Sequence, residues 1–473
     1  MDKSYKKLGI NTLLFSIGSL GQKLLTFLFV PFYTAILSTS DYGTTDLIVT
    51  IVSLIWPIFT LQIDEAILRF CLDKEGSKKT IISIGFWTNI IGIVPMLLFS
   101  VLILGVPVLK PYYLLFVLYY CSYTMNCFTS YAAKGLEKVS LFALSGIVTS
   151  IIVISCNIFF LIVLKIGVIG YLLSYILGYS ITSVFVLIKG KLYKYIRLSS
   201  QEDKKIMKGL YAYSLPLIPN SICWWVNNSL DRLMVAAMCG VSGNGLLAVA
   251  YKIPSMLTTM SSMFSNAWQI SAVEDFGSDK SKKMYSAIYN KYVALNIFIV
   301  SGLTLFVKLI AKILFSKDFY GAWVYAPTLM FASMFMILSG FLGTIYTSSK
   351  KTKMVFYSTV IGAVFNIILN YILIKTTGIQ GAAVATLVSQ AIIWAIRAYD
   401  SQKILKLDVK WHIHVLCFIL IGIEIYIMCA NFMCSIWISA VIVLVLALIN
   451  RSIIEEIILI MKRIIIKKLG RKA

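Results

Sequence analysis

The chain has 473 residues, of which 59% are hydrophobic and only 13% are charged, and its net charge is +23. Soluble proteins carry about 25% charged residues, and a water-soluble fold of this length could not hide so much apolar surface. The composition therefore excludes a soluble domain and indicates helices embedded in a lipid bilayer.

Apolar runs long enough to cross a bilayer recur along the whole chain. Crossing the hydrocarbon takes about 20 mostly apolar residues per helix, and the runs between charged breaks predict about fourteen such helices. The expected fold class is therefore an all-α integral membrane protein. The predicted spans are 8–37, 44–66, 80–105, 112–133, 140–164, 168–188, 209–238, 244–272, 286–315, 323–348, 354–374, 379–398, 411–430 and 435–459.

Lysine and arginine are strongly biased to alternate loops. Of the 43 such residues, 34 fall in the N-terminal segment, the even-numbered loops with adjacent helix ends, and the tail, whereas six fall on the other side. Positive residues are retained in the cytoplasm, so both termini are predicted to be cytoplasmic. The pattern is typical of topology control and of contact with anionic lipid, and it argues against a nucleic-acid partner.

Short segments at similar offsets indicate an internal repeat. Leu37–Gly43 and Cys239–Gly245 are 202 residues apart, and Gly167–Gly170 and Gly378–Gly381 are 211 apart. Each half would hold six helices, so the repeats would be parallel, as in transporters that bind substrate between two halves. The predicted parts are an N-terminal lobe at 1–190, a basic cytoplasmic linker at 191–208, a C-terminal lobe at 209–400, helices thirteen and fourteen within 411–459, and a basic cytoplasmic tail at 460–473.

Lys23 is the sharpest functional candidate. It lies near the middle of the first predicted span, beside Gln22, and no acidic residue lies within one helical turn. A charge at this depth costs roughly 2.5–3.5 kcal/mol on insertion scales and marks a functional site by default. Two interpretations stay open: a water-filled cavity in which Lys23 meets an anion, and an ion pair with a carboxylate from another helix.

The seventh span is unusually polar, and its prolines Pro216 and Pro219 can break a membrane helix. Asp231 and Arg232 are adjacent, so on a helix they point in different directions and each is expected to pair elsewhere. Lys252, on the next helix, is a candidate partner for Asp231, and a structural ion pair stays open beside substrate contact. The polar residues of this span are Asn220, Asn227, Asn228, Asp231 and Arg232.

Three further residues complete the candidate site. Arg69 closes the second span and follows Asp64 and Glu65 at a spacing that permits local pairing. Trp268 and Gln269 could stack on a sugar and hydrogen-bond to it, although a core or interfacial aromatic is the more common interpretation of such a residue. No phosphate-binding glycine loop or metal-ligand cluster occurs in the sequence, so no cofactor, metal or catalytic role is expected.

At these residues the chain resembles the Wzx-type polysaccharide flippases of the multidrug/oligosaccharidyl-lipid/polysaccharide exporter superfamily. The resemblance extends over about residues 8–400, and its motifs are loose. It rests on Lys23, Pro31, Asp41-Tyr-Gly43, Asp64 to Phe70, Leu215 to Ser221, Asn228 to Arg232, Asn266 to Gln269 and Gly378 to Gly381.

The resemblance implies an inner-membrane protein that moves undecaprenyl-pyrophosphate-linked sugar units to the outer leaflet for a surface polysaccharide such as O-antigen or capsule. It implies alternating access of two lobes around a cationic cavity, in which cations offset the desolvation of the pyrophosphate. The implied headgroup path runs from Arg69 to Lys23 and on to Arg232 or Lys252. The expected partners are the lipid-linked oligosaccharide, membrane lipid, a polysaccharide polymerase and a chain-length regulator, and the expected working form is a monomer.

Two other functions remain open at this point. A cation-coupled multidrug exporter of the same superfamily would use buried carboxylates, and only Asp231, Glu424 and Asp46 are candidates. A membrane polysaccharide polymerase would need a large outer loop, whereas the predicted outer loops are short. A structural scaffold is disfavoured because it would not need a midplane charge.

Overall fold

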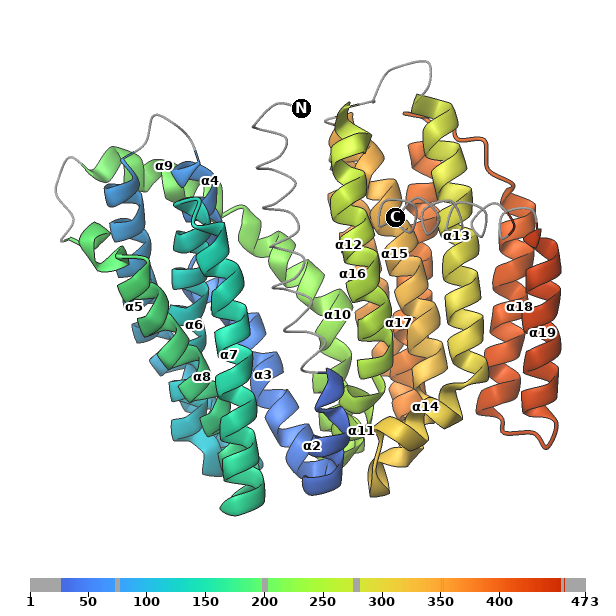
Figure 1. Cartoon of the computed structure of the whole chain (residues 1–473), viewed down its shortest axis with the longest axis horizontal. Helices are drawn as coiled ribbons and strands as arrows, with labels where there is room; N and C mark the ends of the chain where they lie inside the picture. The colour runs from blue at the N-terminus through green and yellow to red at the C-terminus, as the bar shows by residue number, and fades with distance from the viewer. Residues whose placement is uncertain are drawn as a thin grey trace, which may run out of the picture. The chain divides into compact units, whose positions relative to one another are not determined.

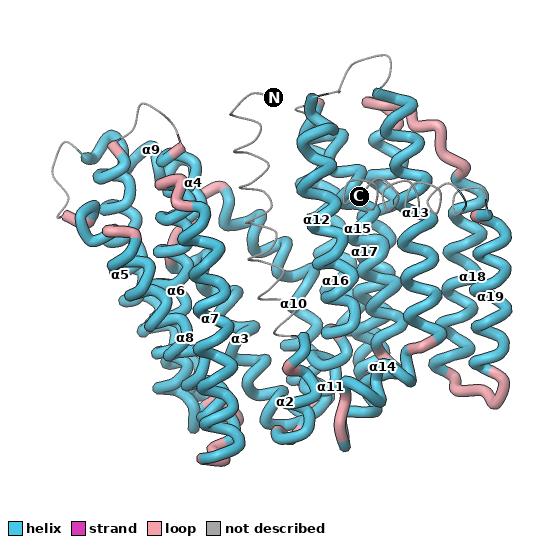
Figure 2. Tube along the Cα trace, viewed as in Figure 1, coloured by secondary structure: helices cyan, strands magenta, loops and turns pink. Residues whose placement is uncertain are grey.

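The computed structural model describes residues 27–72, 77–197, 203–274, 281–349, 351, 353–451 and 455. Within these ranges the secondary structure is helical, with turns between helices and no strand (Figures 1 and 2). The predicted all-α fold class is therefore confirmed. Lys23 and Gln22 lie outside the described residues.

The chain divides into two compact units, each described by itself. The first takes in the described residues up to Ala248 together with Ser316–Phe319. Its α-helices are α2 (Val30–Ile36), α3 (Thr39–Phe59), α4 (Ile63–Cys71), α5 (Lys78–Ser100), α6 (Tyr113–Gly135), α7 (Val139–Ile158), α8 (Gly167–Lys189), α9 (Lys204–Ser214), α10 (Leu217–Cys239) and most of α11 (Val241–Ala250).

The second unit takes in Val249–Phe315 and the described residues from Tyr320 on. The sequence places the boundary between its two lobes in the linker 191–208, and that division into repeats stays a prediction. The helices of the second unit are α12 (Lys252–Glu274), α13 (Ser281–Leu305), α14 (Val307–Leu314), α15 (Ala326–Ser348), α16 (Lys353–Thr377), α17 (Ile379–Ser401), α18 (Trp411–Cys429) and α19 (Ser435–Ile449).

Nine helices of the described residues are long and apolar enough to cross a membrane. Four other predicted spans correspond to α6, to α9 with α10, to α11 with α12, and to α19. Polar residues lower the hydropathy of α10 and α12, and α19 is a shorter apolar helix of 15 residues. The predicted first span lies mostly before residue 27, so the count of fourteen stays a prediction.

Prolines divide two of the runs that hydropathy treats as single helices. Pro219 has no N–H to offer the carbonyl of Leu215, and the helix breaks between Ser214 and Leu217. Pro254 likewise cannot bond to the carbonyl of Ala250, and a turn at Tyr251 separates α11 from α12. These breaks set where the polar residues of α10 and Lys252 fall.

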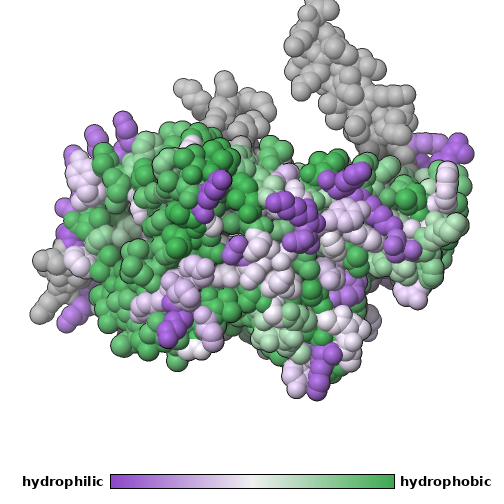
Figure 3. Space-filling model, turned by 90° about the horizontal axis from the view of Figure 1, so that it is seen from below, coloured by the Kyte–Doolittle hydropathy of each residue, from purple (hydrophilic) through white to green (hydrophobic). Residues whose placement is uncertain are grey.

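The outer surface of each unit is suited to lipid. Large apolar side chains are exposed along many helices, including Leu98 of α5, Val184 of α8 and Leu444 of α19, each more than half exposed. Water would not tolerate so many, whereas acyl chains solvate them. Figure 3 shows one face of the molecule, where apolar residues cover broad areas and hydrophilic residues gather in smaller groups.

Two buried ionisable side chains tie helices together in the second unit. Arg397 of α17 donates to the Ser339 carbonyl of α15 at 3.1 Å and to the Ser358 hydroxyl of α16 at 2.9 Å. Glu424 of α18 accepts hydrogen bonds from Ser301 of α13 and Ser439 of α19, both at 2.6 Å. Each fastens three helices, because its bonds would have no equivalent in the surrounding hydrocarbon.

Candidate functional site

A row of polar contacts joins α3 to α10 and α11 within the first unit. Arg232 forms an ion pair with Asp46, its Nη1 lying 2.9 Å from Oδ1. Asn244 donates to the other Asp46 oxygen at 3.3 Å, so two helices supply partners to one carboxylate. Deeper along α3, the Trp225 indole donates to the Thr50 carbonyl at 3.2 Å and to the Ser53 hydroxyl at 3.0 Å. We call these residues the α3–α10 seam.

The seam begins where two glycines let α3 and α11 approach closely. A Cβ at Gly43 would lie 2.0 Å from the Val241 carbonyl oxygen, and a Cβ at Gly245 would lie 2.0 Å from the Thr39 carbonyl oxygen. Gly43 and Gly245 are 202 residues apart, and so are their partners Thr39 and Val241, so the two contacts are equivalent when α3 and α11 are exchanged. Small residues permit such backbone contact between membrane helices.

Local sequence fixes the start of α3 at this contact. Ser38 and Asp41 form a capping box, in which the Ser38 hydroxyl accepts from the Asp41 N–H at 3.0 Å and the Asp41 carboxylate accepts from the Ser38 N–H. The Thr39 and Ser242 hydroxyl oxygens then lie 2.6 Å apart, and Asn244 donates to the Gly43 carbonyl at 3.0 Å. The helix end and the glycine contact together hold Asp46 one turn further along.

The remaining polar residues of α10 have different surroundings. Asp231 is buried and its carboxylate accepts from the backbone N–H of Arg232 at 2.9 Å. Asn227 is buried and donates to the Cys223 carbonyl at 2.9 Å, whereas Asn228 donates to the Trp224 carbonyl at 2.6 Å. Asn220 is exposed. Arg232 therefore has the ion pair that the sequence left open as an alternative, with Asp46 as its partner.

A second polar group lies around α4, where the chain turns sharply after α3. Leu61 and Gln62 have φ of 52° and 54°, in the left-handed region, and Gln62 donates to the Ser221 hydroxyl at 2.6 Å. The turn places Asp64 in a fully buried position, where Asn89 of α5 donates to it at 3.1 Å. The sequence predicts only that Asp64 lies near the end of a span, whereas the structure shows that its side chain is buried.

Glu65 and Arg69 complete that group. The Tyr131 hydroxyl of α6 donates to the Glu65 carboxylate at 2.8 Å. Arg69 lies in the last turn of α4 and is exposed, where a cation complements the helix dipole. Lys134 of α6 lies over the Tyr131 and Phe142 rings, with its nitrogen 4.7 and 4.1 Å from their centroids.

In the second unit, Trp268 belongs to an aromatic cluster. Its ring stacks on Phe341 with centroids 5.0 Å apart, and its indole donates to Thr344 at 3.1 Å. Trp268 is buried, and its contact with a sugar stays a prediction. Gln269 lies on α12, and Lys252 is the first residue of that helix and is half-buried.

Sequence reasoning missed Arg397 altogether. It lies one residue before the end of the predicted span 379–398, so the sequence groups it with the basic loop that follows. In the structure, α17 continues to Ser401 and Arg397 is buried. Four of its donor contacts go to neutral groups on α15 and α16, including Val355 and Thr359. Arg397 directly follows the apolar run Ala391–Ile396, and a basic residue at that place is the signal that could have indicated its burial.

Comparison with known proteins identifies the family. The model of a family described as polysaccharide biosynthesis protein matches residues 8–270, more than half of the chain. The chain belongs to the polysaccharide biosynthesis protein family. A second family model, described as MatE, matches residues 216–372 of the chain. The α3–α10 seam lies within the first match.

A curated relative and a solved structure match nearly the whole chain. An uncharacterized membrane protein of Methanocaldococcus jannaschii is 24% identical over 411 residues, covering 82% of this chain and 97% of the relative. A structure of the lipid II flippase MurJ in an inward closed conformation superposes with a TM-score of 0.69 at 14% identity, covering 93% of this chain and all of that one.

Exporters of the MOP superfamily have the same fold. An inward-facing multidrug resistance MATE family transporter gives a TM-score of 0.57 at 14% identity, covering 86% of this chain and 99% of that one. A MOP superfamily transporter from Pyrococcus furiosus gives 0.57 at 13% identity, covering 83% and 94%. The chain is therefore a multi-pass membrane protein, and it has the fold that transporters and flippases of that superfamily share.

Proposed function

We propose that the chain is a flippase that moves undecaprenyl-pyrophosphate-linked oligosaccharide units across the cytoplasmic membrane for synthesis of a surface polysaccharide. The observation that carries the proposal is its membership of the polysaccharide biosynthesis protein family over residues 8–270. The likeness to a lipid II flippase over nearly the whole chain supports it, because that protein's name states a lipid-linked substrate.

In this proposal, cationic side chains offset the cost of moving a pyrophosphate through a low-dielectric region. Lys23, Arg69 and Lys252 are the residues we assign to the headgroup. Arg232 is compensated by Asp46 at 2.9 Å, so we assign it to the α3–α10 seam, and contact with the headgroup would require that pair to open. Alternating access of two lobes completes the mechanism that we propose.

The same proposal extends to location and partners. We place the protein in the bacterial inner membrane with both termini in the cytoplasm, because 34 of 43 basic residues lie on one predicted side. We propose that it works as a monomer and delivers its product to a polysaccharide polymerase with its chain-length regulator. The longest described connection on the predicted outer side, Phe306–Tyr325, is itself mostly helical, which leaves the polymerase alternative without the large loop that it requires.

A cation-coupled multidrug exporter is the second candidate, favoured by the MatE match at residues 216–372. Such an exporter would use buried carboxylates. Asp231 is buried, and Asp64 and Glu424 are fully buried. However, Glu424 is engaged with two serines and Asp64 with Asn89, which equally suits structural roles.

The test is deletion of the gene in its source cell, followed by complementation with the wild-type chain, Lys23→Ala or Lys23→Arg. Deletion should remove surface polysaccharide and leave lipid-linked oligosaccharide in the cytoplasmic leaflet. Lys23→Ala should restore less than about a tenth of export, whereas Lys23→Arg, which keeps the charge, should restore most of it, at equal protein level. Unchanged polysaccharide after deletion, with new sensitivity to drugs, would establish the exporter instead.

A further inference from the structure

A buried acid and a buried amide meet near the start of α4. Asp64 of α4 and Asn89 of α5 are both almost completely buried. The Asn89 side-chain nitrogen donates one hydrogen bond to Asp64 Oδ1 at 3.1 Å and another to the Gly85 carbonyl at 3.0 Å. Both N–H bonds of the amide are therefore used. The amide cannot be turned over, because its oxygen would then meet the carbonyl oxygen of Gly85, which only accepts.

The two remaining oxygens of this pair have no hydrogen-bond partner among the described residues. They are Asp64 Oδ2 and Asn89 Oδ1, and both atoms are buried. An amide oxygen and an ionised carboxylate oxygen can only accept hydrogen bonds, so neither satisfies the other while Asp64 is charged. Two unpaired buried acceptors, one of them on a buried charge, are costly. A single proton on Oδ2 would serve both, since Oδ2–H could donate to Asn89 Oδ1 and close an acid–amide ring of two hydrogen bonds.

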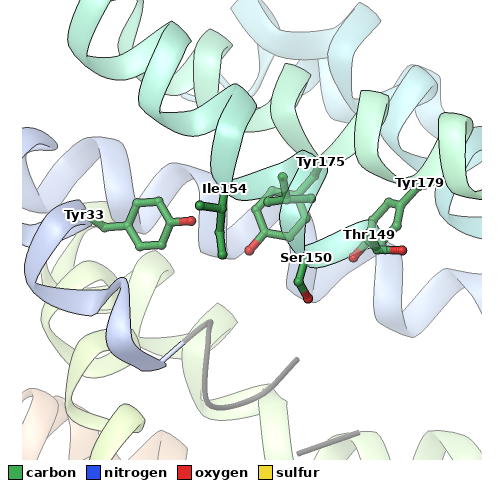
Figure 4. A pocket seen from close by; sticks show the side chains of 7 residues that line it. Tyr33, Thr149, Ser150, Ile154, Tyr175 and Tyr179 are labelled. Carbon is green, nitrogen blue, oxygen red and sulfur yellow. The ribbon is translucent and has the colours of Figure 1, made fainter. Parts of the chain in front are cut away.

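Buried hydroxyl groups of the first unit do not pose the same problem. Figure 4 shows Tyr33, Tyr175 and Tyr179 beside a cavity of about 30 Å³, which has room for about one or two water molecules. A hydroxyl group both donates and accepts, so Tyr171 donates to Tyr175 at 3.4 Å without any added proton. The Asp64–Asn89 pair presents acceptors on both sides, and only a bound cation or proton satisfies both of them together.

Close packing around the pair favours a proton over a metal ion. A Cβ at Gly85 would lie 2.2 Å from Cδ1 of Ile67, and a Cβ at Gly92 would lie 2.2 Å from the Phe59 carbonyl oxygen. Asn89 lies between these two glycines, so α5 packs tightly against α4 and against the end of α3 on either side of it. A metal cation needs about six oxygen ligands, whereas a proton needs only the two oxygens of the pair.

The pair is connected to α10 through the turn that precedes α4. Leu61 and Gln62 have φ of 52° and 54°, a left-handed conformation that residues other than glycine rarely adopt and that clusters in switching segments. Gln62 donates to the Ser221 hydroxyl of α10 at 2.6 Å, and Asp64 follows two residues later. A change of charge on Asp64 would therefore act next to a strained turn that contacts α10.

The adjacent acid, Glu65, has a donor of its own. The Tyr131 hydroxyl donates to its carboxylate at 2.8 Å, whereas Asp64 Oδ2 has no donor among the described residues. Of the two neighbouring acids, Asp64 is therefore the one whose geometry calls for a proton. The titratable groups that α4, α6 and α9 place around the pair are Glu65, Tyr120, Cys127, Tyr131, Lys134 and Tyr211.

We propose that Asp64 and Asn89 form a proton-binding site, and that the proton held there couples the transport cycle to a proton gradient. Binding forms an O–H bond on Asp64 Oδ2, and release breaks that bond and returns the proton to water. The inference rests on the proposed flippase function and names the ion coupled to it. With the proton bound, the acid–amide ring holds α4 against α5. Release leaves a buried charge and two unpaired acceptors, which favours rearrangement of the turn at Leu61 and Gln62.

The variant Asp64→Asn separates a proton site from a structural acid. Asparagine has the shape of the protonated acid, and its amide can close the same ring with Asn89 but cannot release a proton. The matched control is Glu137→Gln, at an acid of the same unit whose side chain is 59% exposed. The purified full chains are compared in nanodiscs by the infrared carbonyl stretch of a protonated carboxyl group and by the thermal unfolding midpoint from acid to alkaline pH.

We expect a protonated-carboxyl band in the wild type that Asp64→Asn lacks and Glu137→Gln keeps. Asp64→Asn should be as stable as the wild type at acid pH. Because the folded wild type holds a proton that it must lose or retain at a cost, its midpoint should fall relative to that of Asp64→Asn as the pH rises. Identical spectra for Asp64→Asn and the wild type would overturn the proton site. So would a midpoint that rises with added Na⁺ in the wild type but not in Asp64→Asn.

Transport is measured in proteoliposomes that hold lipid-linked oligosaccharide extracted from source cells lacking the gene, by the access of periodate to sugars that reach the far leaflet. Under an imposed pH gradient, the wild type and Glu137→Gln should move this lipid about tenfold faster than Asp64→Asn. Equal rates for Asp64→Asn and the wild type would overturn the coupling proton and leave the flippase proposal intact. A wild-type chain that moves no lipid, with or without the gradient, would overturn both.

Discussion

Gly43 and Gly245 each fit against the backbone of the helix that carries the other, so that a Cβ on either one would lie 2.0 Å from a carbonyl oxygen. The two positions are 202 residues apart, which is the offset that the sequence predicts for its repeat. The contact brings together the first turns of α3 and α11 and precedes the Asp46–Arg232 ion pair. A structural role for these glycines leads to the first prediction.

Gly43→Ala should destabilise the first unit by about 1–3 kcal/mol, because the added methyl group overpacks a backbone contact. Gly245→Ala should have the same effect by the equivalent clash with Thr39. The thermal unfolding midpoint in detergent measures both changes. Gly340→Ala in α15, where a Cβ meets nothing within 4 Å, is the control and should be neutral or slightly stabilising. Equal unfolding midpoints for all three variants would contradict the inference that the contact between α3 and α11 requires glycine at both positions.

Asp46→Asn and Arg232→Gln should be non-additive. Either single change leaves a charge without its main partner in a partly buried seam, where the side chains are 11% and 23% exposed. The double variant should therefore lose less stability than the sum of the singles, with a coupling free energy of about 0.5–3 kcal/mol. Unfolding midpoints of the wild type, the two single variants and the double variant complete this double-mutant cycle. Strictly additive losses would show that the Asp46–Arg232 ion pair contributes nothing to stability.

Glu424→Gln should be nearly neutral, whereas Glu424→Leu should cost about 1–3 kcal/mol. Glutamine can keep hydrogen bonds to Ser301 and Ser439, while leucine leaves both hydroxyl groups without their partner. Proteolysis of the helix pair α18 and α19 in mild detergent reports their detachment from α13. If an export assay instead showed that Glu424→Gln is inactive and fully stable, Glu424 would belong to a proton-coupled transport step.

Arg397→Lys should destabilise the second unit by about 1–3 kcal/mol. A lysine ammonium cannot reproduce the planar set of donors by which Arg397 contacts Ser339, Val355, Ser358 and Thr359. Lys403→Arg, at a residue whose side chain is 66% exposed, is the matched control for exchange of one cation for another. The unfolding midpoint should fall only for Arg397→Lys.

The sequence predicted most of the fold because a bilayer imposes its length on each apolar run. The predicted span 168–188 matches α8 to within one residue at each end, and the span 140–164 matches α7 together with the π-helical turn Phe159–Val163 that follows it. Runs containing Pro219 or Pro254 were recovered as single spans, although the structure breaks each one. Hydropathy averages over a window and does not register the loss of one backbone donor.

The contacts of the candidate site were harder to predict. Asp46 and Arg232 are 186 residues apart, and no pattern in one sequence names such a partner. Tyr171, Tyr175 and Tyr179 recur at helical spacing in the sequence, but such an aromatic row is typical of ordinary packing, and only the structure shows that their rings are in contact along α8. The roles of Lys23, Arg69 and Lys252 stay predictions.

The closeness of Thr39 to Ser242 gives the contact between α3 and α11 a practical use. Their hydroxyl oxygens are 2.6 Å apart, which brings the two side chains near enough for a disulfide once both are cysteine. Oxidation would then cross-link the two helices, and dithiothreitol would reduce the disulfide. If export continues while the disulfide is formed, the α3–α11 contact stays fixed during the transport cycle. If export stops until the disulfide is reduced, the two helices must separate for transport to occur.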